Sequence, residues 1–600
     1  MSASRAIILG GKAAQQLLRL PSLAPAAGRL LSTPAAVARR GLGQAARRYA
    51  GWQGRAFGVS AMAASDEPVT RTYPYAPLGV PLDPKQTEIS WNGQSPSSFD
   101  GDLLVLGVCE DAFATADEVT SIASEELKLF DAALGGALTD IVALHDFAGK
   151  TGSSQTLRCG GSKGPKYVTL CGLGPADKLK VVADWGSSPL QALGSGAAAA
   201  AKAHKAKRVG VALVGTNFSD DDTAAAAGKV ANGFVNGAYE STRFKSKSKD
   251  SSVESVALML GGNEAAAASA VQHGQALALG ALLTRYLVEA PPNVCTPSYL
   301  ADTAAKIAAA APEVMKLEVL EREDCEALGM GLYLGVAAAS AEPPKFIHLT
   351  YTPKGEVRKR VAIVGKGLTF DSGGYNIKAG AGSMIEMMKF DMGGSGAALG
   401  AAKVLSLLQP EGVEVHFVVA SCENMVAGSG LRPGDILVAS NGKTVEVNNT
   451  DAEGRLTLAD ALLFAQKQCG AEAIVDIATL TGACMIALGD GMGGMWSPSD
   501  ELAASLSAAS RRAGEKLWRM PLEDSYFEQL KSSCADMKNT GGRLGGSITA
   551  ALFLKEYVDT DKVQWSHLDI AGPVWRDKDG GATGFGAQLL AEWAMQQGQQ

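Results

Sequence analysis

In the second half of the chain, short apolar runs alternate with stretches of helical composition. The apolar runs are KFIHLTY, RVAIVGKGLTF, VEVHFVVAS, AEAIVDIATL and VQWSHLDIAG. Runs of this kind are expected of strands that are buried on both faces of a sheet, which requires helices on both sides. We therefore predict a C-terminal α/β domain over residues 291–600, with a mixed sheet flanked by helices.

A smaller α/β domain is predicted over residues 87–263. Its strand-like runs are DLLVLGV, KYVTLCGLG, RVGVALVG and SVALMLGG, and they alternate with Ala-rich helical stretches at 190–206 and 224–235. This alternation is typical of a parallel or mixed sheet covered by helices. The Ala-rich segment 264–290 is predicted to be a helix that connects the two domains.

Several carboxylates of the second domain follow predicted strands or accompany Gly-rich turns. Asp371 ends VAIVGKGLTFD, Asp391 precedes the turn GGSG, and Asp451 follows the strand-like run KTVEV. Each has a simple structural explanation when taken alone: Asp451, for example, could be the N-cap of the next helix, with Glu453 complementing the helix dipole. In open α/β sheets, however, the ligand crevice lies outside the carboxyl ends of the strands. Their shared position therefore predicts a site.

Carboxylates crowded into one crevice repel one another unless a cation holds them, so this cluster predicts bound metal. Oxygen-rich ligands suit Mg²⁺ or Mn²⁺, Zn²⁺ is also compatible, and carboxylates can bridge two ions about 3.5 to 4 Å apart. We predict two divalent ions, Mn²⁺ or Zn²⁺, with Mg²⁺ as an alternative. Histidine ligation is nearly excluded, because the six histidines form no HExxH motif and no pair at ligand spacing.

The motifs around these carboxylates resemble those of one enzyme family. They are VGKGLTFDSGG (364–374), ENM (423–425), RPGD (432–435), NTDAEGRL (449–456), DIATLTGA (476–483), NTGG (539–542) and HLDIAGP (567–573). From about Ala270 to the C-terminus, the chain resembles the leucyl aminopeptidase (cytosol aminopeptidase) family of dinuclear metallopeptidases. The number and order of these motifs make a chance resemblance negligible.

The resemblance implies a ligand set. Lys366, Asp371, Asp391 and Glu453 would hold the tighter, inner metal ion. Asp371, Asp451 and Glu453 would hold the more exchangeable one, so that Asp371 and Glu453 bridge the two ions. A lysine can ligate only as the neutral amine, which requires a neighbouring dication and burial to lower its pKa.

The resemblance also implies catalytic and substrate-binding residues. Lys378 would polarise the scissile carbonyl and stabilise the oxyanion, and Arg455 would hold a bicarbonate ion that acts as general base. The pocket for the first side chain of the substrate would be apolar and would favour Leu or Met. Its residues would be Met388, Thr479, Leu480 and Gly482.

The implied reaction is hydrolysis of the N-terminal peptide bond of a peptide with a free α-amine. One ion would take that amine, and a water that bridges the ions would attack the carbonyl. The family resemblance also implies a homohexamer. Two alternatives remain open: a non-catalytic binding or chaperone-like hexamer that retains the peptidase core, and another dinuclear hydrolase such as a phosphoesterase.

Residues 1–65 have the composition of a transit peptide, with eight Arg, one Lys and no Asp or Glu. The segment VSAMAAS (59–65) favours a plastid address over a mitochondrial one, and the Pro-rich residues 66–86 are predicted to be a linker. Removal of residues 1–65 leaves 46 Lys and Arg against 62 Asp and Glu, a net charge of −16. Such a charge opposes nonspecific nucleic-acid binding.

No apolar run approaches the ~18 residues of a membrane span, so we expect no membrane partner. The nine cysteines show no CxxC spacing, and several lie in apolar runs. Reduced, buried thiols are therefore expected.

Overall fold

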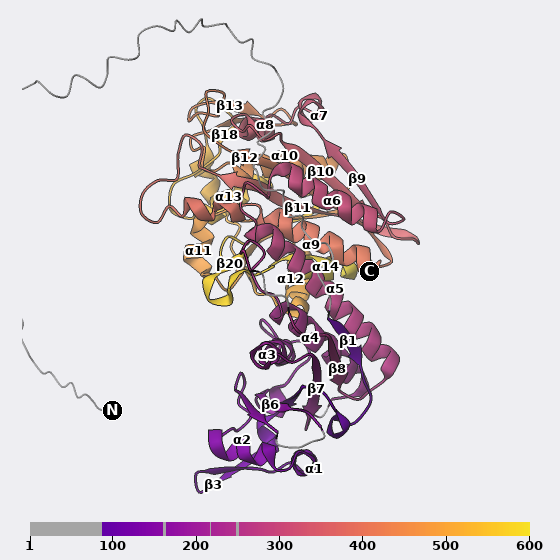
Figure 1. Cartoon of the computed structure of the whole chain (residues 1–600). Coiled ribbons are helices and arrows are strands. Elements are labelled where there is room, and N and C mark those ends of the chain that lie inside the picture. The colour runs from indigo at the N-terminus through magenta and orange to yellow at the C-terminus, as the bar shows by residue number, and fades with distance from the viewer. Residues whose placement is uncertain (1–86, 160–163, 217, 248–250, 600) are drawn as a thin grey trace, which may run out of the picture. The chain divides into compact units, whose positions relative to one another are not determined.

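The computed structural model describes residues 87–159, 164–216, 218–247 and 251–599 (Figure 1). The predicted transit peptide (1–65) and linker (66–86) lie outside these described residues. Two separate sheets, each covered by helices, account for most of the described chain. The prediction of two α/β domains is therefore confirmed.

The N-terminal domain contains a six-stranded sheet in the order β1-β8-β7-β2-β6-β5. All neighbouring strands are parallel except β5 and β6, which are antiparallel. The strands are β1 (Glu88–Trp91), β2 (Leu103–Val108), β5 (Ser154–Arg158), β6 (Tyr167–Gly172), β7 (Arg208–Val214) and β8 (Ser255–Met259). The sequence predicted four of them; β1 and β5, at the two edges of the sheet, are less apolar and were missed.

Two layers of helices cover this sheet. The apolar residues of α3 (Pro189–His204) and α4 (Asp220–Gly237) share one core with the sheet. Those of α1 (Glu125–Ala133) and α2 (Ala137–His145) pack in a second core. A hairpin of β3 (Phe113–Ala116) and β4 (Val119–Ile122) precedes α1.

A single long helix, α5 (Glu264–Glu289), packs against both α4 of the N-terminal domain and α9 (Gly393–Leu408) of the C-terminal domain (Figure 1). Small residues allow the close approach. A Cβ on Gly274 would collide with the backbone of Gly228 in α4, and a Cβ on Gly280 would lie 2.6 Å from the carbonyl oxygen of Gly400 in α9. The abundance of Ala and Gly in α5 is therefore explained by close helix packing.

The C-terminal domain contains an eight-stranded mixed sheet in the order β17-β16-β19-β15-β11-β12-β10-β9. The four central strands, β19, β15, β11 and β12, are mutually parallel, whereas β16, β10 and β9 pair antiparallel with their inner neighbours. The strands are β9 (Met315–Leu320), β10 (Lys345–Tyr351), β11 (Val357–Asp371), β12 (Gly412–Asn424), β15 (Ala473–Ala478), β16 (Gly493–Trp496), β17 (Leu517–Arg519) and β19 (Gln564–Asp569).

Side chains of the central strands alternate between two apolar cores, as expected for buried strands. In β11, Val361 and Ile363 belong to one core, and Ala362 and Val364 belong to the other. The first core includes residues of α5, α6 (Pro297–Ala310), α9, α12 (Asp500–Ala513) and α14 (Ala587–Gln597). The second includes residues of α7 (Arg322–Ala327), α8 (Gly331–Ala337), α10 (Gly454–Lys467) and α13 (Gly546–Lys555).

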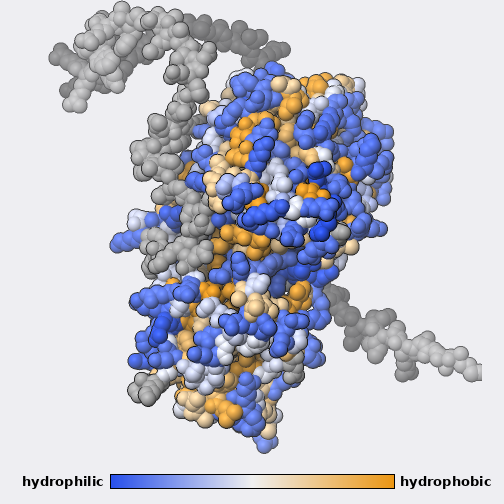
Figure 2. Space-filling model, turned by 90° about the vertical axis from the view of Figure 1, so that its right-hand side faces the viewer, coloured by the Kyte–Doolittle hydropathy of each residue, from blue (hydrophilic) through white to orange (hydrophobic). Residues whose placement is uncertain are grey.

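Short elements connect these layers. They are the 3₁₀ turn Ile385–Phe390, the helix α11 (Gly482–Leu488), the small sheet of β13 (Ile436–Val438), β14 (Thr444–Glu446) and β18 (Met537–Lys538), and the pair β20 (Trp575–Arg576) and β21 (Gly581–Ala582). On the face shown in Figure 2, hydrophilic residues predominate and apolar residues form separate patches. Within the described residues, no helix combines the length and apolar character that crossing a membrane requires.

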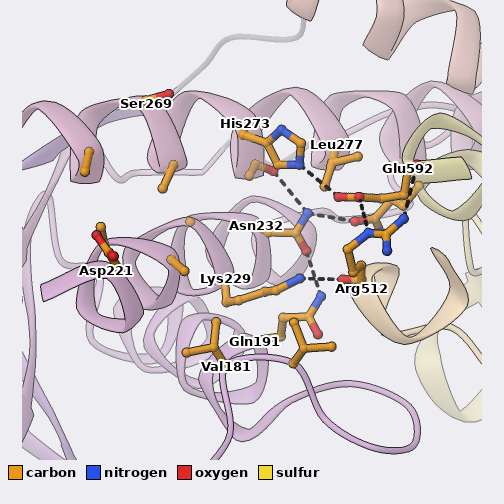
Figure 3. Close-up of a pocket in the computed structure, with 18 residues that line it drawn as sticks. Val181, Gln191, Asp221, Lys229, Asn232, Ser269, His273, Leu277, Arg512 and Glu592 are labelled. Atoms are coloured by element: carbon orange, nitrogen blue, oxygen red, sulfur yellow. Dashed lines mark hydrogen bonds and ion pairs between the residues drawn. The ribbon is translucent and has the colours of Figure 1, made fainter. Parts of the chain in front are cut away.

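Helices of the two domains meet at a polar cluster beside a cavity of about 580 Å³ (Figure 3). Glu592 of α14 accepts hydrogen bonds from His273 of α5 (2.8 Å) and from Arg512 of α12 (2.9 Å). Asn232 of α4 donates to the side chain of Gln588 (2.8 Å). Burial disfavours the Glu592 carboxylate, but the hydrogen bond from His273 and the cation of Arg512 outweigh this effect and lower the pKa of Glu592 to about 2.

We expect Glu592→Gln to reduce the stability of the domain contact by about 1 to 3 kcal/mol at pH 7, because a buried ion pair loses its anion. The carboxylate has a lower pKa in the folded protein than the 4.5 of an ordinary Glu. Its contribution is therefore complete above about pH 4.5 and disappears as the pH falls toward 2. Thermal unfolding of both proteins between pH 7 and pH 3 measures this difference.

The exposed Glu264 at the start of α5 provides the control, since Glu264→Gln should leave the melting temperature unchanged at every pH. A melting-temperature difference between wild type and Glu592→Gln that stays constant down to pH 3 would contradict the ion-pair explanation.

Candidate active site

Polar side chains gather at the carboxyl ends of the four central parallel strands of the C-terminal sheet. Asp371 is the last residue of β11, Asn424 is the last of β12, and Asp569 is the last of β19. Thr479 follows β15 directly. The strand-end position inferred from the sequence is therefore the position at which the structure collects these groups.

Three carboxylates come from separate elements and converge. Asp371 ends β11, Asp391 lies between the 3₁₀ turn Ile385–Phe390 and α9, and Glu453 occupies the N-cap position of α10. One oxygen of each lies within 4.8 Å of the others, and all three residues are buried. Asp451 lies closer to the opening, with its side chain 34% exposed.

Two lysines lie among these carboxylates. Lys366 Nζ is 2.7 Å from Asp391 and 3.0 Å from Glu453, and it donates to the carbonyl oxygen of Thr479 (3.1 Å). Lys378 Nζ is 2.8 Å from Asp371 and forms a second ion pair with Asp451. The two cations therefore bind different carboxylates, Lys366 on the inner side and Lys378 toward the solvent.

The site carries more negative than positive charge in a buried setting. Burial, reinforced by Asp371, raises the pKa of Glu453 to about 8 despite the nearby Lys366. Burial likewise raises the pKa of Asp391 to about 6, although Lys366 opposes this shift. For Lys366, burial lowers the pKa, but the surrounding carboxylates outweigh it and raise the pKa above its usual value.

The residues present fit divalent cations. Glu453 Oε2 is buried and makes no hydrogen bond, and Asp391 Oδ2 and Asp451 Oδ1 meet lysine ammonium groups without good hydrogen-bond geometry. Buried carboxylate oxygens without donors are costly unless a cation binds them. Four carboxylates and one lysine form a set dominated by oxygen, which suits Mg²⁺, Mn²⁺ or Zn²⁺.

Arg455 lies in the first turn of α10 and is buried. Its Nη1 donates to the carbonyl oxygen of Asn539 (2.8 Å), whereas its Nε has no hydrogen-bonding partner. Burial lowers the pKa of Arg455 to about 10, with Glu453 and Asp569 opposing the shift, so the side chain is a cation at neutral pH. A buried N–H donor without a partner is suited to a small planar anion.

The four carboxylates, the two lysines and Arg455 line one cavity of about 570 Å³. Every site residue expected from the sequence lies in its wall: Lys366, Asp371, Lys378, Met388, Asp391, Asp451, Glu453, Arg455, Thr479, Leu480 and Gly482. Met384, Phe390 and Met485 add to the apolar part of the wall. The cavity wall thus combines charged and apolar side chains.

Comparison with known proteins identifies the family. The model of the catalytic domain of the cytosol aminopeptidase family matches residues 282–591, and that of the family's N-terminal domain matches residues 105–248. The chain belongs to the cytosol aminopeptidase family. The family resemblance and the prediction of a leucyl aminopeptidase, a metallo-exopeptidase, are thereby confirmed.

Plant members of the family are similar over most of their length. Leucine aminopeptidase 2, chloroplastic, of Arabidopsis thaliana is 49% identical over 546 residues, which cover 90% of this chain and 92% of that protein. Neutral leucine aminopeptidase, chloroplastic, of Solanum lycopersicum is 50% identical, covering 82% and 85%. The solved structure of a tomato leucine aminopeptidase mutant has a TM-score of 0.79 at 45% identity, covering 86% of this chain and 99% of that one.

The sequence analysis did not predict the roles of several residues that hold the site in place. Asp569 accepts hydrogen bonds from Leu480 N (3.2 Å) and Thr481 Oγ1 (2.6 Å), which fixes the loop after β15. Asn424 donates to Asp371 (2.8 Å) and orients it. Both residues lie in motifs noted above, HLDIAGP and ENM. The motifs therefore pointed to these residues, although the hydrogen bonds they make could not be inferred from the sequence.

The simple structural alternative for Asp451 is wrong. The N-cap position of α10 belongs to Glu453, which makes no side-chain capping hydrogen bond. Asp451 instead forms an ion pair with Lys378 in the wall of the cavity.

Gly454 offers a direct test of the position of Lys366. A Cβ at Gly454 would lie 2.6 Å from Lys366 Nζ, so the lysine would have to leave its place between Asp391 and Glu453. Displacing a buried lysine from two buried carboxylates costs more than the roughly 1 kcal/mol that alanine adds to a helix, so we expect Gly454→Ala to fold with a lower melting temperature. Its aminopeptidase activity at limiting Mn²⁺ should fall about tenfold or more, measured by release of p-nitroaniline from leucine p-nitroanilide.

Gly491→Ala is the matched control, because a Cβ there would meet no atom within 4 Å. Wild-type metal dependence in Gly454→Ala would show that the position of Lys366 does not matter for metal loading.

Proposed function

We propose that the protein removes N-terminal apolar residues from peptides with the help of two divalent ions. The observation that carries this proposal is the buried carboxylate oxygen of Glu453 that lacks a hydrogen bond, in a cluster with Asp371 and Asp391 that lines a cavity shared with apolar side chains. The family assignment supports the reaction. When bound, the ions would supply Lewis-acid chemistry and a water acidic enough to attack a carbonyl at neutral pH.

We assign Lys366, Asp371, Asp391 and Glu453 to the inner ion, and Asp371, Asp451 and Glu453 to the outer one. The depth of the side chains supports this order. The side chains of Lys366 and Asp391 are 3% and 6% exposed, whereas that of Asp451 is 34% exposed. An ion held partly by Asp451 is closer to solvent and therefore exchanges more readily.

Lys378 is assigned to polarisation of the scissile carbonyl. Burial lowers its pKa, but Asp371 and the neighbouring carboxylates outweigh burial and keep the side chain cationic at neutral pH. A cation fixed at the edge of a site that excludes water stabilises developing negative charge on the carbonyl oxygen. Lys378 lies in the loop after β11, where Gly380 and Gly382 have φ angles of +86° and +82° that other residues rarely adopt. These glycines therefore shape the turn that carries it.

Arg455 is assigned to binding a bicarbonate ion that acts as general base. The unpartnered Nε and the planar guanidinium suit two oxygens of a carbonate-type anion. The carbonyl of Asn539 holds Nη1 and thereby fixes the plane of the guanidinium. The anion would take a proton from the attacking water and pass it to the leaving amine.

The apolar part of the cavity is assigned to the first side chain of the substrate. Met388 and Leu480 supply apolar surface, and Gly482 leaves open space, because a Cβ there would meet no atom within 4 Å. Such a wall favours Leu and Met. Since one methylene group is worth only about 1 to 3 kcal/mol in a hydrophobic pocket, we expect broad specificity.

We also propose a homohexamer in the plastid stroma. Large apolar side chains near the cavity support assembly, since Ile486 of α11 is 86% exposed and Leu544 is 81% exposed. The chloroplastic relatives and the composition of residues 1–65 support a plastid address, with residues 66–86 as linker. The proposed division of the remaining chain is 87–263, the connecting segment 264–290, and 291–600.

Metal removal tests the reaction. We expect protein stripped with a chelator to lose hydrolysis of leucine p-nitroanilide and to regain it on addition of Mn²⁺ or Zn²⁺. The N-acetylated substrate should remain intact under all conditions, because it lacks the free amine. Activity that survives chelation, with metal shown absent by mass spectrometry, would overturn the metal-dependent mechanism.

Substitutions separate ligands from the proposed base. We expect Glu453→Gln and Asp371→Asn to abolish turnover with the fold retained, since each removes a carboxylate that would hold both ions. Arg455→Ala should slow turnover by about a hundredfold, the usual size of a general-base effect. Wild-type activity should also fall in carbonate-free buffer and recover with bicarbonate, whereas Arg455→Ala should not respond.

Glu386→Gln is the control, because Glu386 is exposed in the neighbouring 3₁₀ turn and does not line the cavity. An equal response of wild type and Arg455→Ala to bicarbonate would contradict the assignment of Arg455.

A further inference from the structure

A second group of metal-ligating side chains lies in the C-terminal domain away from the cavity. It consists of His348 in β10, His416 in β12 and Cys469 just after α10, and one ligand atom of each lies within 4.8 Å of the others. His348 Nε2 is 2.9 Å from His416 Nδ1 and 3.6 Å from Cys469 Sγ. We refer to these three residues as the His–Cys cluster.

The fold explains why these residues meet. In the antiparallel pair of β10 and β12, Thr350 lies opposite His416 and His348 lies opposite Val418. His348 and His416 are therefore diagonal neighbours on one face of the sheet. Helix α10 packs on that face and ends at Lys467, two residues before Cys469. This position of α10 places the Cys469 thiol beside the two imidazole rings.

Each imidazole has a carboxylate at its other ring nitrogen. Glu318, opposite His348 on β9, places Oε2 3.5 Å from His348 Nδ1. Glu414, two residues before His416 on the same strand, places Oε1 3.2 Å from His416 Nε2. Metal-ligating histidines commonly donate their second N–H to a carboxylate in this way, which fixes the tautomer and the orientation of the ring. Here the arrangement leaves His348 Nε2 and His416 Nδ1 facing each other, with Cys469 Sγ beside His348 Nε2.

We propose that the His–Cys cluster binds one zinc-class divalent ion through His348 Nε2, His416 Nδ1 and Cys469 Sγ. A tetrahedral ion with bonds of about 2.0 Å to nitrogen and 2.3 Å to sulfur separates sulfur and nitrogen by about 3.5 Å and two nitrogens by about 3.3 Å. The observed separation of Cys469 Sγ and His348 Nε2, 3.6 Å, already matches, and the ligand atom of His416 lies within 4.8 Å of both. The two nitrogens, now 2.9 Å apart, would move apart by a few tenths of an ångström.

The fourth position is assigned to water. The hydroxyl of Thr350, 3.2 Å from His348 Nε2 and 3.4 Å from His416 Nδ1, is placed to hydrogen-bond to it. On binding, the S–H bond of Cys469 breaks, a bond between metal and sulfur forms, and the proton passes to solvent. The soft sulfur and nitrogen ligands select Zn²⁺ and similar ions over Mg²⁺ or Ca²⁺. Glu318 is exposed beside His348, so the ion would reach the cluster from this side.

The cluster is separate from the candidate active site. His416 lies four residues before Ala420, which pairs with Lys366, so the two sites are about 13 Å apart along the strand. Both sites nevertheless use residues at the ends of α10. Glu453 and Arg455 lie at its first turn, and Cys469 follows its last turn. The ion would anchor the C-terminal end of this helix to β10 and β12, and its role is structural.

The test uses Co²⁺ as a spectroscopic substitute for Zn²⁺. Metal-stripped full-length protein is titrated with Co²⁺, and absorption from thiolate-to-cobalt charge transfer is recorded in the near ultraviolet. The described residues that line the active-site cavity include no cysteine, so this band reports the His–Cys cluster independently of the catalytic ions. The two proposed catalytic sites also take up Co²⁺, so we expect the band to saturate by three equivalents per chain, at the intensity of one cobalt–thiolate site, and to disappear when Zn²⁺ is added.

Cys469→Ala and His416→Gln should each lose the band, and Cys469→Ala should retain aminopeptidase activity. Cys171→Ala is the matched control, because Cys171 is equally buried but lies in the N-terminal domain, hydrogen-bonded to Ser154 (3.6 Å). It should keep the band. A band that persists in Cys469→Ala, or no band in folded wild-type protein at saturating Co²⁺, would overturn the proposal. If His416→Gln fails to fold, Cys469→Ala alone decides.

Discussion

The structure depends on holding several carboxylates together out of water. Four carboxylates, two lysines and two arginines line one cavity, and most of them are buried. Such a cluster is stable only if each charge finds an opposite charge or a donor. Lys366 and Lys378 compensate part of the negative charge. One oxygen of Glu453 still has no hydrogen bond, so the compensation is incomplete. The surrounding fold can be understood as the framework that holds these groups in place.

Parallel strands supply that framework because their carboxyl ends meet at one edge. β11, β12, β15 and β19 each end in, or lead directly into, a residue that holds or orients the cluster. The apolar residues of these strands fill two cores that leave them little freedom to shift. Asn424 and Asp569, which bind Asp371 and the loop after β15, transmit this rigidity to the site. A change far down a strand would therefore move ligands as well as destabilise the core.

The sequence predicted the central strands well, and the structure brings the predicted site residues to one cavity, both for a physical reason. Buried parallel strands such as β11 and β15 have a continuous apolar pattern, and charged residues at their ends stand out against it. The edge strands β1 and β5 were missed because they are shorter and more polar. The roles of Asn539 and Asp569 were also missed, since a hydrogen bond to a distant backbone group leaves no local pattern. The small number and the spacing of the histidines argue in the sequence against histidine ligation, and the structure places two histidines and a cysteine side by side.

That last difference shows what spacing cannot reveal. His348 and His416 are 68 residues apart, and only the antiparallel pairing of β10 with β12 makes them neighbours. The proposed ion there and the proposed catalytic ions would sit at opposite ends of α10 with different ligands. Oxygen-rich carboxylates accept Mg²⁺, Mn²⁺ or Zn²⁺, whereas imidazole and thiolate favour Zn²⁺. The two sites would therefore respond differently to the same metal supply: exchange of the catalytic ions would change turnover, whereas loss of the ion at the His–Cys cluster would loosen only the C-terminal end of α10 and leave turnover unchanged.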